Sequence, residues 1–474
     1  MNGRWGGACL VAVAAASLAA CAAHAPRRVL LGPGAAVPLE TSVPALARPA
    51  ERREAAAHPV EIHPEFTLAF IEFDDQGRLW SRAELELLDA SLTSEARREQ
   101  NDGVLLIFFA HGWKHDARVC DGNAACFRAY LAQLAAGFEA AARLAGAGVR
   151  PPRVVGIYAG WRGRSVTVPI LRNLSFWSRK KAAERVGGGE VIELLVHLDQ
   201  FARAANAGGR ERATLIIIGH SFGGTMVYTA LANVLKARLV EALHRRGRVP
   251  ADENVVEGFG NLVVLVNPAF EAALYAPLED LVGELRTTSR FQSPVLVVVG
   301  SETDVPTRLW FRMGRFIDTL FQRAGPRSSR ATLTTSVGNY APFSTHRLDV
   351  GAPSAPGVKT ARVSGCECRL PVSDLPLDQS RDIARFLTHR QAGELPEEAT
   401  PLETSPCAEG VVLGSVRLTC GPGVDPSRPI WNIRASDDVV HGHSDFFTRP
   451  FLDFLRFVIW DSLTKRAERC APAD

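Results

Sequence analysis

The sequence lacks a strong excess of charge of either sign. Its 474 residues include 54 basic and 51 acidic side chains, which gives a formal net charge of +3. Nucleic-acid-binding proteins usually carry a large basic excess or a clustered basic stripe, and neither is present here, so we expect no nucleic-acid partner. The remaining composition, 46% hydrophobic and 22% charged, excludes collagen-like, coiled-coil and wholly disordered chains.

Long apolar runs are also scarce, which excludes a protein with several membrane spans. The one long run, Ala8 to Ala16, lies at the N-terminus, and the mean hydropathy is only +0.01. Arg4 precedes this run and small residues follow it, a pattern typical of a secretory signal peptide over residues 1–20. Internal repeats are absent as well, so a solenoid or propeller is not expected.

The end of this leader has a more specific pattern. Leu18-Ala19-Ala20-Cys21 resembles the bacterial lipobox, in which the cysteine is lipidated and becomes the new N-terminus. The resemblance implies a protein of the bacterial cell envelope that is anchored to a membrane through lipid on Cys21. Ala22 after the cysteine resembles the sorting pattern for the outer membrane. The alternative is an ordinary signal peptide with a cysteine at its cleavage site.

The segment after the leader has no apolar periodicity. Residues 21–60 are rich in alanine, proline and arginine, and they are interpreted as a flexible tether. An α/β domain is expected over residues 61–465, with a cysteine-bearing insertion at 305–429.

Seven of the nine cysteines lie outside the leader and its end, and in an oxidising compartment they are disulfide candidates. Cys120 and Cys126 bracket a turn-prone stretch, and a local bridge between them is one interpretation. The other pairings stay open. A zinc site at Cys366 and Cys368 is disfavoured because their spacing matches no common zinc motif.

Short apolar runs alternate with helical patterns through the middle of the chain. This alternation predicts an α/β fold with a doubly wound, mostly parallel sheet that is covered by helices on both faces. An outer strand is expected at Phe66–Phe73. The other predicted strands are Val104–Ala110, Arg153–Tyr158, Thr214–Ile218, Leu262–Val266, Pro294–Val299 and Ile430–Arg434. Active sites of such sheets lie beyond the carboxyl ends of the strands.

A serine motif follows the predicted strand Thr214–Ile218. Gly219-His220-Ser221-Phe222-Gly223 fits G-x-S-x-G, the sharp turn that raises a serine above the sheet at the start of a helix. With this motif the chain resembles the α/β-hydrolase superfamily, in particular bacterial lipases and esterases. The likeness runs from about Phe66 to Phe451 and rests on the order of the motifs. It implies a sheet of the α/β-hydrolase type with a large insertion before the last strand.

The resemblance also implies roles for other residues. His111-Gly112-Trp113 resembles the oxyanion loop of the family, so backbone amides of Trp113 and Phe222 are the expected oxyanion donors, while the His111 side chain braces its loop. Gly300 to Asp304 resembles the turn that carries the catalytic acid. Asp304 is the expected acid, and Glu302 is the alternative. A helix N-cap is the structural interpretation of Asp304.

The loop after the last predicted strand offers two histidines for the base. His443 is favoured, because His443-Ser444-Asp445 runs directly into an aromatic helix, and His441 is the alternative. Asn267 occupies the position that holds the acid in some relatives. Trp161–Gly187 is interpreted either as a lid or as an amphipathic helix that covers the core.

These residues together predict a membrane-anchored serine hydrolase that cleaves carboxylic esters, with Ser221, His443 and Asp304 as its catalytic residues. The expected partners are an ester-containing small molecule or lipid substrate and a membrane, with no metal and no organic cofactor. A thioesterase, acyltransferase or peptidase with the same serine turn is one alternative. A non-catalytic envelope lipoprotein that retains the fold is another.

Overall fold

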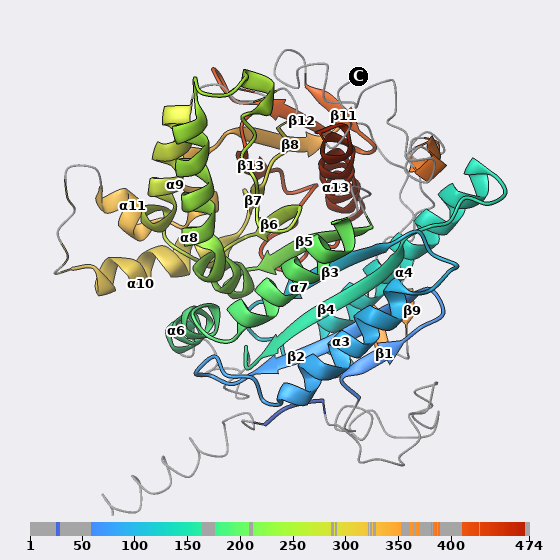
Figure 1. The fold of residues 1–474 in the computed structure, drawn as a ribbon. Coiled ribbons are helices and arrows are strands. Elements are labelled where there is room, and N and C mark those ends of the chain that lie inside the picture. Colours follow the sequence, from blue (N-terminus) through green and yellow to red (C-terminus); the bar gives the residue numbers. More distant parts are fainter. Residues whose placement is uncertain are drawn as a thin grey trace, which may run out of the picture.

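The computed structural model describes residues 25–28, 58–163, 176–207, 212–285, 292–320, 329–351, 410–425 and 427–469. It also describes residues 289, 322, 325, 361–363 and 366–368 and parts of 381–388 (Figure 1).

A single large sheet organises the described residues. Its eleven strands, in spatial order, are β1 (Val60–Ile62), β2 (Phe66–Phe73), β4 (Arg153–Trp161), β3 (Val104–Ala110), β5 (Ala213–His220), β6 (Leu262–Val266), β7 (Leu296–Ser301), β13 (Ile430–Ala435), β8 (His346–Val350), β12 (Val416–Cys420) and β11 (Val411–Leu413). The strands from β2 to β8 are parallel, whereas β1 at one edge and β12 and β11 at the other pair antiparallel.

Helices cover both faces of this sheet. On one face lie α3 (Arg82–Ala96), α6 (Phe176–Gly187), α7 (Val191–Asn206), α8 (Phe222–Arg245) and α9 (Ala272–Leu285). On the other lie α4 (Gly122–Ala145) and α13 (Arg449–Arg469). Adjacent residues of each central strand point to opposite faces, so Ile217 of β5 contributes to one core and Ile216 to the other.

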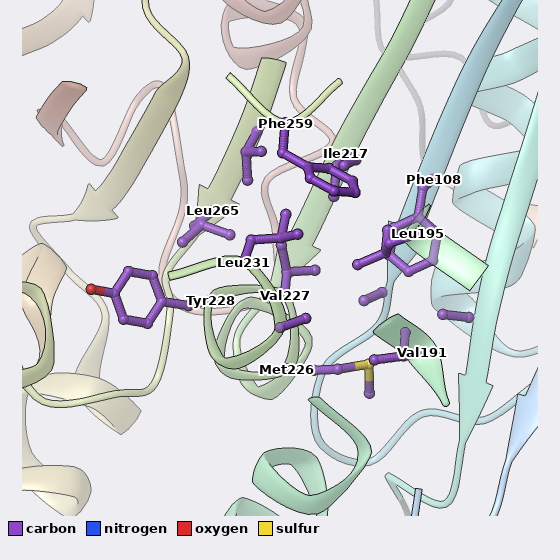
Figure 2. Packing of buried hydrophobic residues seen from close by; sticks show 14 of the residues in the cluster. Phe108, Val191, Leu195, Ile217, Met226, Val227, Tyr228, Leu231, Phe259 and Leu265 are labelled. Carbon is purple, nitrogen blue, oxygen red and sulfur yellow. The ribbon is translucent and has the colours of Figure 1, made fainter. Parts of the chain in front are cut away.

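The packing of α8 shows why the central strands are largely apolar. Met226 of this helix lies beside Val191 at the start of α7, while Val227 and Leu231 project from α8 towards the sheet (Figure 2). Phe108 of β3 and Ile217 of β5 meet them from the strands. Strands buried on both faces favour apolar side chains at most positions, as the sequence has them.

The predicted α/β class and the mostly parallel sheet are confirmed. The observed strands include the predicted runs, with β4 extended to Trp161 and β7 beginning two residues later than expected. The expectation that Phe66–Phe73 is an outer strand is wrong, because β1 pairs with the outer side of β2 and is itself the edge strand.

The segment between residues 305 and 429 joins the main sheet. Its strand β8 pairs parallel with β13, and the antiparallel hairpin of β11 and β12 extends the sheet further, with β12 next to β8. A separate hairpin, β9 (Ala361–Val363) with β10 (Cys366–Cys368), lies against α4.

Two disulfides fasten this hairpin to the start of α4. Cys120 is bonded to Cys366 and Cys126 to Cys368. The interpretation that Cys120 and Cys126 form a local disulfide with each other is therefore wrong. Residues Gly122 to Cys126 already belong to α4, so the chain there forms a helix instead of a closed loop. Cys366 and Cys368, for which a zinc site is disfavoured from the sequence, are both held in these bridges.

Residues 25–28 lie within the segment interpreted as a tether, yet they are fixed against the sheet. The backbone amides of Arg27 and Arg28 both donate to Oε1 of Glu72, at 2.7 Å. The Arg28 guanidinium is buried, donates to Glu61 at 2.9 Å and lies 3.5 Å from the centroid of the Phe70 ring. The leader, Cys21 and residues 29–57 lie outside the described residues.

In the part of the chain that the structure describes, none of the helices has the length and apolar character needed to cross a membrane.

Candidate active site

Ser221 lies at the turn between β5 and α8. Its backbone has φ 56° and ψ −117°, a conformation that non-glycine residues rarely adopt and that costs on the order of 1–3 kcal/mol. The turn is held by the Ser221 amide, which donates to the carbonyl of Val266 at 2.9 Å, and by the Ser221 carbonyl, which accepts from the amide of Ala269. The neighbouring strand β6 therefore supports the strained position.

Glycines make this turn sterically feasible. A Cβ on Gly223 would lie 2.0 Å from the carbonyl oxygen of Ala110 at the end of β3. A Cβ on Gly219 would lie 2.8 Å from the carbonyl oxygen of Gly223. The G-x-S-x-G spacing thus reflects close backbone contacts between β3, β5 and the first turn of α8.

Three side chains from distant parts of the chain meet at this turn. Ser221 Oγ lies 2.7 Å from Nε2 of His443, and Nδ1 of His443 lies 2.8 Å from Oδ1 of Asp304. Ser221 and Asp304 are 2% and 1% exposed. They follow β5 and β7, and His443 follows β13, so all three lie at the carboxyl edge of the sheet.

Asp304 is fixed by a second set of hydrogen bonds. Thr307 donates its hydroxyl to Oδ2 at 2.5 Å and its amide to Oδ1 at 3.1 Å. Asn339 in turn donates to the Thr307 hydroxyl at 2.8 Å. Asp304 therefore both caps the helical turn that follows it and holds the His443 imidazole, so the two interpretations of this residue from the sequence are compatible.

The two alternative residues lie elsewhere. Glu302 forms an ion pair with Arg347 at 2.6 Å. His441 is exposed and contacts Asp437 at 2.9 Å. Among the described residues, the structure therefore brings Asp304 and His443 to Ser221, and neither Glu302 nor His441.

The backbone of the His443 loop is held by two side chains whose part in the site the sequence did not indicate. Asn267 donates its side-chain amide to the carbonyls of Gly442 at 3.1 Å and His443 at 2.9 Å. Its Oδ1 accepts the Ser301 amide at 2.8 Å. Asn267 has φ 45°, which asparagine tolerates better than most residues. An asparagine directly after a buried strand was the available signal.

His220 is the second of these side chains. Its Nε2 lies 2.9 Å from the carbonyl oxygen of His443. Burial, together with the neighbouring His443, holds the pKa of His220 well below its ordinary value, so the ring is neutral and Nε2–H is the donor. His220 therefore positions the His443 loop and does not itself contact Ser221 as a base.

The loop after β3 forms the other side of the turn. A Cβ on Gly112 would lie 2.9 Å from Cβ of Ser221, so this loop runs directly beside the serine. Nε2 of His111 accepts the Trp161 amide at 3.1 Å and Nδ1 lies 2.9 Å from the Gly112 carbonyl. Burial lowers the pKa of His111 to about 4, so it braces the loop as a neutral ring.

The two expected oxyanion donors flank Ser221. Trp113 follows Gly112 in that loop, and Phe222 is the first residue of α8, where a helix leaves its first amides without partners inside the helix. Phe176 of α6 packs against both, with ring centroids 5.3 Å from Trp113 and 4.8 Å from Phe222. The described part of Trp161–Gly187 thus includes a helix packed on α8, while residues 164–175 lie outside the described residues.

This arrangement is suited to proton transfer from a serine hydroxyl. An imidazole that accepts from the hydroxyl and donates to a buried carboxylate can remove the hydroxyl proton when the oxygen attacks a carbonyl carbon. Within the described residues, no group of histidine, cysteine and acidic side chains is arranged to hold a metal ion.

Comparisons with protein-family models, with curated proteins and with solved structures found no match to this chain.

Proposed function

We propose that the chain is a serine hydrolase of the α/β-hydrolase type that cleaves carboxylic esters through an acyl-enzyme. One observation supports this most directly: the unbroken hydrogen-bond path from Ser221 Oγ through the His443 imidazole to Asp304. The serine turn, the acid and the histidine follow in the chain order of that superfamily.

In the proposed first step, Ser221 Oγ attacks the carbonyl carbon of the ester, and its proton moves to Nε2 of His443. Asp304 accepts a hydrogen bond from Nδ1, which fixes the tautomer and stabilises the imidazolium that forms. The carboxylate is already oriented by Thr307 and needs no rearrangement as charge develops.

The carbonyl oxygen gains negative charge in the tetrahedral intermediate. We assign its stabilisation to the backbone amides of Phe222 and Trp113, on the two sides of Ser221. Loss of one such donor typically costs about 3 kcal/mol of transition-state stabilisation. Collapse of the intermediate breaks the bond to the leaving alcohol, which takes the proton from Nε2 of His443.

Water completes the cycle. His443 removes a proton from the water, the resulting hydroxide attacks the acyl carbonyl, and Ser221 leaves with that proton as the carboxylic acid is released. Every proton transfer in these reaction steps passes through Nε2 of His443. The proposed reaction therefore uses side chains and water and requires no organic cofactor.

A fluorophosphonate probe tests the proposal, because it reacts covalently with an activated serine. We expect labelling of the wild-type chain and none of Ser221→Ala. Ser91→Ala is the matched control, since the Ser91 hydroxyl only donates to the Leu87 carbonyl within α3. Absence of labelling in the wild type, or equal labelling of Ser221→Ala, would refute the assignment.

The base is tested by comparing two histidine variants. His443→Ala is expected to lower the hydrolysis of p-nitrophenyl esters by at least 10³-fold, as removal of a triad member does. His441→Ala is expected to keep activity because His441 is exposed and contacts Asp437. Equal activity of the two variants would contradict the assignment of His443.

The cellular location is part of the same proposal. Lipidation of Cys21 would anchor the enzyme in the bacterial cell envelope, at the outer membrane. Metabolic labelling with an alkyne-bearing fatty acid tests it, with incorporation expected in the wild type and lost in Cys21→Ser.

A further inference from the structure

Helix α10 (Phe311–Asp318) has its polar contacts towards the protein and its apolar side chains towards solvent. It follows Asp304 through the helical turn η3 (Pro306–Trp310). On its inner side, Phe311 is buried, and Arg315 Nε lies 2.6 Å from Oε1 of Glu271, which also pairs with Lys180 at 3.1 Å. The helix is therefore held to the protein both by these ion pairs and by apolar packing, since the centroid of the Phe311 ring lies 6.0 Å from that of the Trp177 ring of α6.

The outer side of this segment is apolar. Its exposed side chains, here named the α10 apolar face, are Leu309 (51% exposed), Trp310 (57%), Met313 (52%), Phe316 (53%), Ile317 (67%) and Leu320 (50%). Their spacing of three and four residues places them on one side of a helix. Exposed apolar patches of this kind mark interaction sites with proteins or membranes.

The charges around the face favour an anionic partner. The sequence from 305 to 330 contains six arginines and one aspartate. Arg315 is paired with Glu271 and Asp318. Arg308, Arg312 and Arg330 are exposed; Arg308 donates to the carbonyl of Glu302 and Arg330 to that of Thr319, so neither of these two is paired with a carboxylate in these contacts. A second copy of the chain on this face would bring like charges together, but an anionic lipid surface complements them. Helices with arginine beside tryptophan, phenylalanine and leucine are typical of the membrane interface.

The location of the face agrees with a membrane in that direction. Figure 1 shows α10 projecting from one side of the molecule, and the segment begins at the carboxyl end of β7. Residues 25–28 bind Glu72, which is next to the carboxyl end of β2, at the same edge of the sheet. Ala25 is four positions after Cys21 in the chain, a span of at most about 14 Å. A lipid on Cys21 would hold this edge close to the bilayer.

We propose that the α10 apolar face docks on the surface of an anionic lipid bilayer. Trp310, Met313 and Ile317 enter the boundary between headgroups and acyl chains, and Arg308 and Arg312 contact lipid phosphates. The carboxyl edge of the sheet then faces the membrane. This inference stands on α10 and residues 25–28, it rests on the proposed lipidation of Cys21 for the direction of the membrane, and it does not require Ser221 to be a nucleophile.

Hydrogen–deuterium exchange of the full chain tests the proposal. We expect the amides of residues 311–318 to exchange at least threefold more slowly with vesicles of phosphatidylglycerol and phosphatidylethanolamine than without vesicles. Met313→Asp and Ile317→Asp should remove this protection. Val412→Asp is the matched control, because Val412 is 53% exposed on β11 at the far edge of the sheet. This variant should keep the protection.

Three results would overturn the proposal. The first is unchanged exchange of α10 in the presence of vesicles, whether or not the chain sediments with them. The second is equal protection by neutral phosphatidylcholine vesicles, which contradicts an anionic partner. The third is protection that rises with protein concentration in the absence of lipid, which assigns the face to a second copy of the chain.

Discussion

Asn267 offers the sharpest test of how the His443 loop is positioned. Replacing it with alanine removes three hydrogen bonds, two to the carbonyls of Gly442 and His443 and one from the Ser301 amide. At about 1 kcal/mol for each buried bond, the loss is about 3 kcal/mol. Alanine also adopts the φ of 45° less readily, which adds on the order of 1 kcal/mol. We therefore expect the free energy of unfolding of Asn267→Ala to be about 3–4 kcal/mol lower than that of the wild type.

We expect the same substitution to slow the reaction of Ser221 with fluorophosphonate by more than the loss of stability explains. The His443 imidazole must remain within hydrogen-bond reach of Ser221, and a misplacement of about 1 Å can cost on the order of 10²-fold in rate. We expect fluorophosphonate to label Asn267→Ala about 10- to 100-fold more slowly than the wild type, under conditions where both are folded. Urea unfolding and the labelling rate are measured on the same preparations.

Asn206 supplies the matched control. Its side chain also makes three hydrogen bonds to backbone, one to the Ala213 carbonyl and two from the amides of Arg212 and Ala213, but it joins α7 to β5 away from the site. Asn206→Ala should lose stability and keep the labelling rate. The reasoning fails if Asn267→Ala labels at the wild-type rate, or if Asn206→Ala slows labelling equally.

Three further predictions follow from buried contacts. Thr307→Val removes the hydroxyl that donates to Asp304 and should lower kcat/KM for p-nitrophenyl esters about tenfold with little change in melting temperature, a loss that Thr307→Ser should restore. Burial raises the pKa of Glu84 from 4.5 to about 8, so its contribution to stability is complete below pH 4.5 and is lost as the pH rises through about 8. Urea unfolding at pH 5 and pH 8 measures how much the free energy of unfolding falls between the two. We expect this fall to be smaller in Glu84→Gln than in the wild type, by on the order of 2 kcal/mol, and an equal fall would contradict the raised pKa of Glu84. In the double variant Cys366→Ser, Cys368→Ser, the free energy of unfolding should fall by about 5 kcal/mol, as measured by urea unfolding. This is the value for one disulfide-closed loop of 246 residues, because the second disulfide closes little additional chain.

The sequence was sufficient to predict the parallel strands because their burial on both faces leaves a local signal. Val104–Ala110 and Leu262–Val266 are uninterrupted apolar runs, and the structure has strands with those same bounds. Ser221, Asp304 and His443 were predicted from the loops that follow such strands. That these loops lie together follows from the parallel arrangement, because the carboxyl ends of parallel strands share one edge.

Contacts between distant segments left no such signal. The pairing of Cys120 with Cys366 depends on where a hairpin 246 residues later packs on α4. Residues 25–28 have the composition of a tether, and the carboxylates that bind them, Glu61 and Glu72, come from strands more than 30 residues later in the chain. From the sequence, Asn267 is only a position that lacks an acid, because its contact with the His443 loop joins residues 176 positions apart in the chain.

The position of β13 also bears on how the chain matures as it is synthesised. This strand, residues 430–435, lies between β7 and β8, which end about 130 and 80 residues earlier in the chain. Until it emerges, both neighbours have an open edge, and a nascent chain is exposed to edge-to-edge association. The loop that carries His443 arrives immediately behind the strand that closes the sheet. An unfinished chain therefore has Ser221 and Asp304 but no His443, and the three side chains come together only as the sheet is completed.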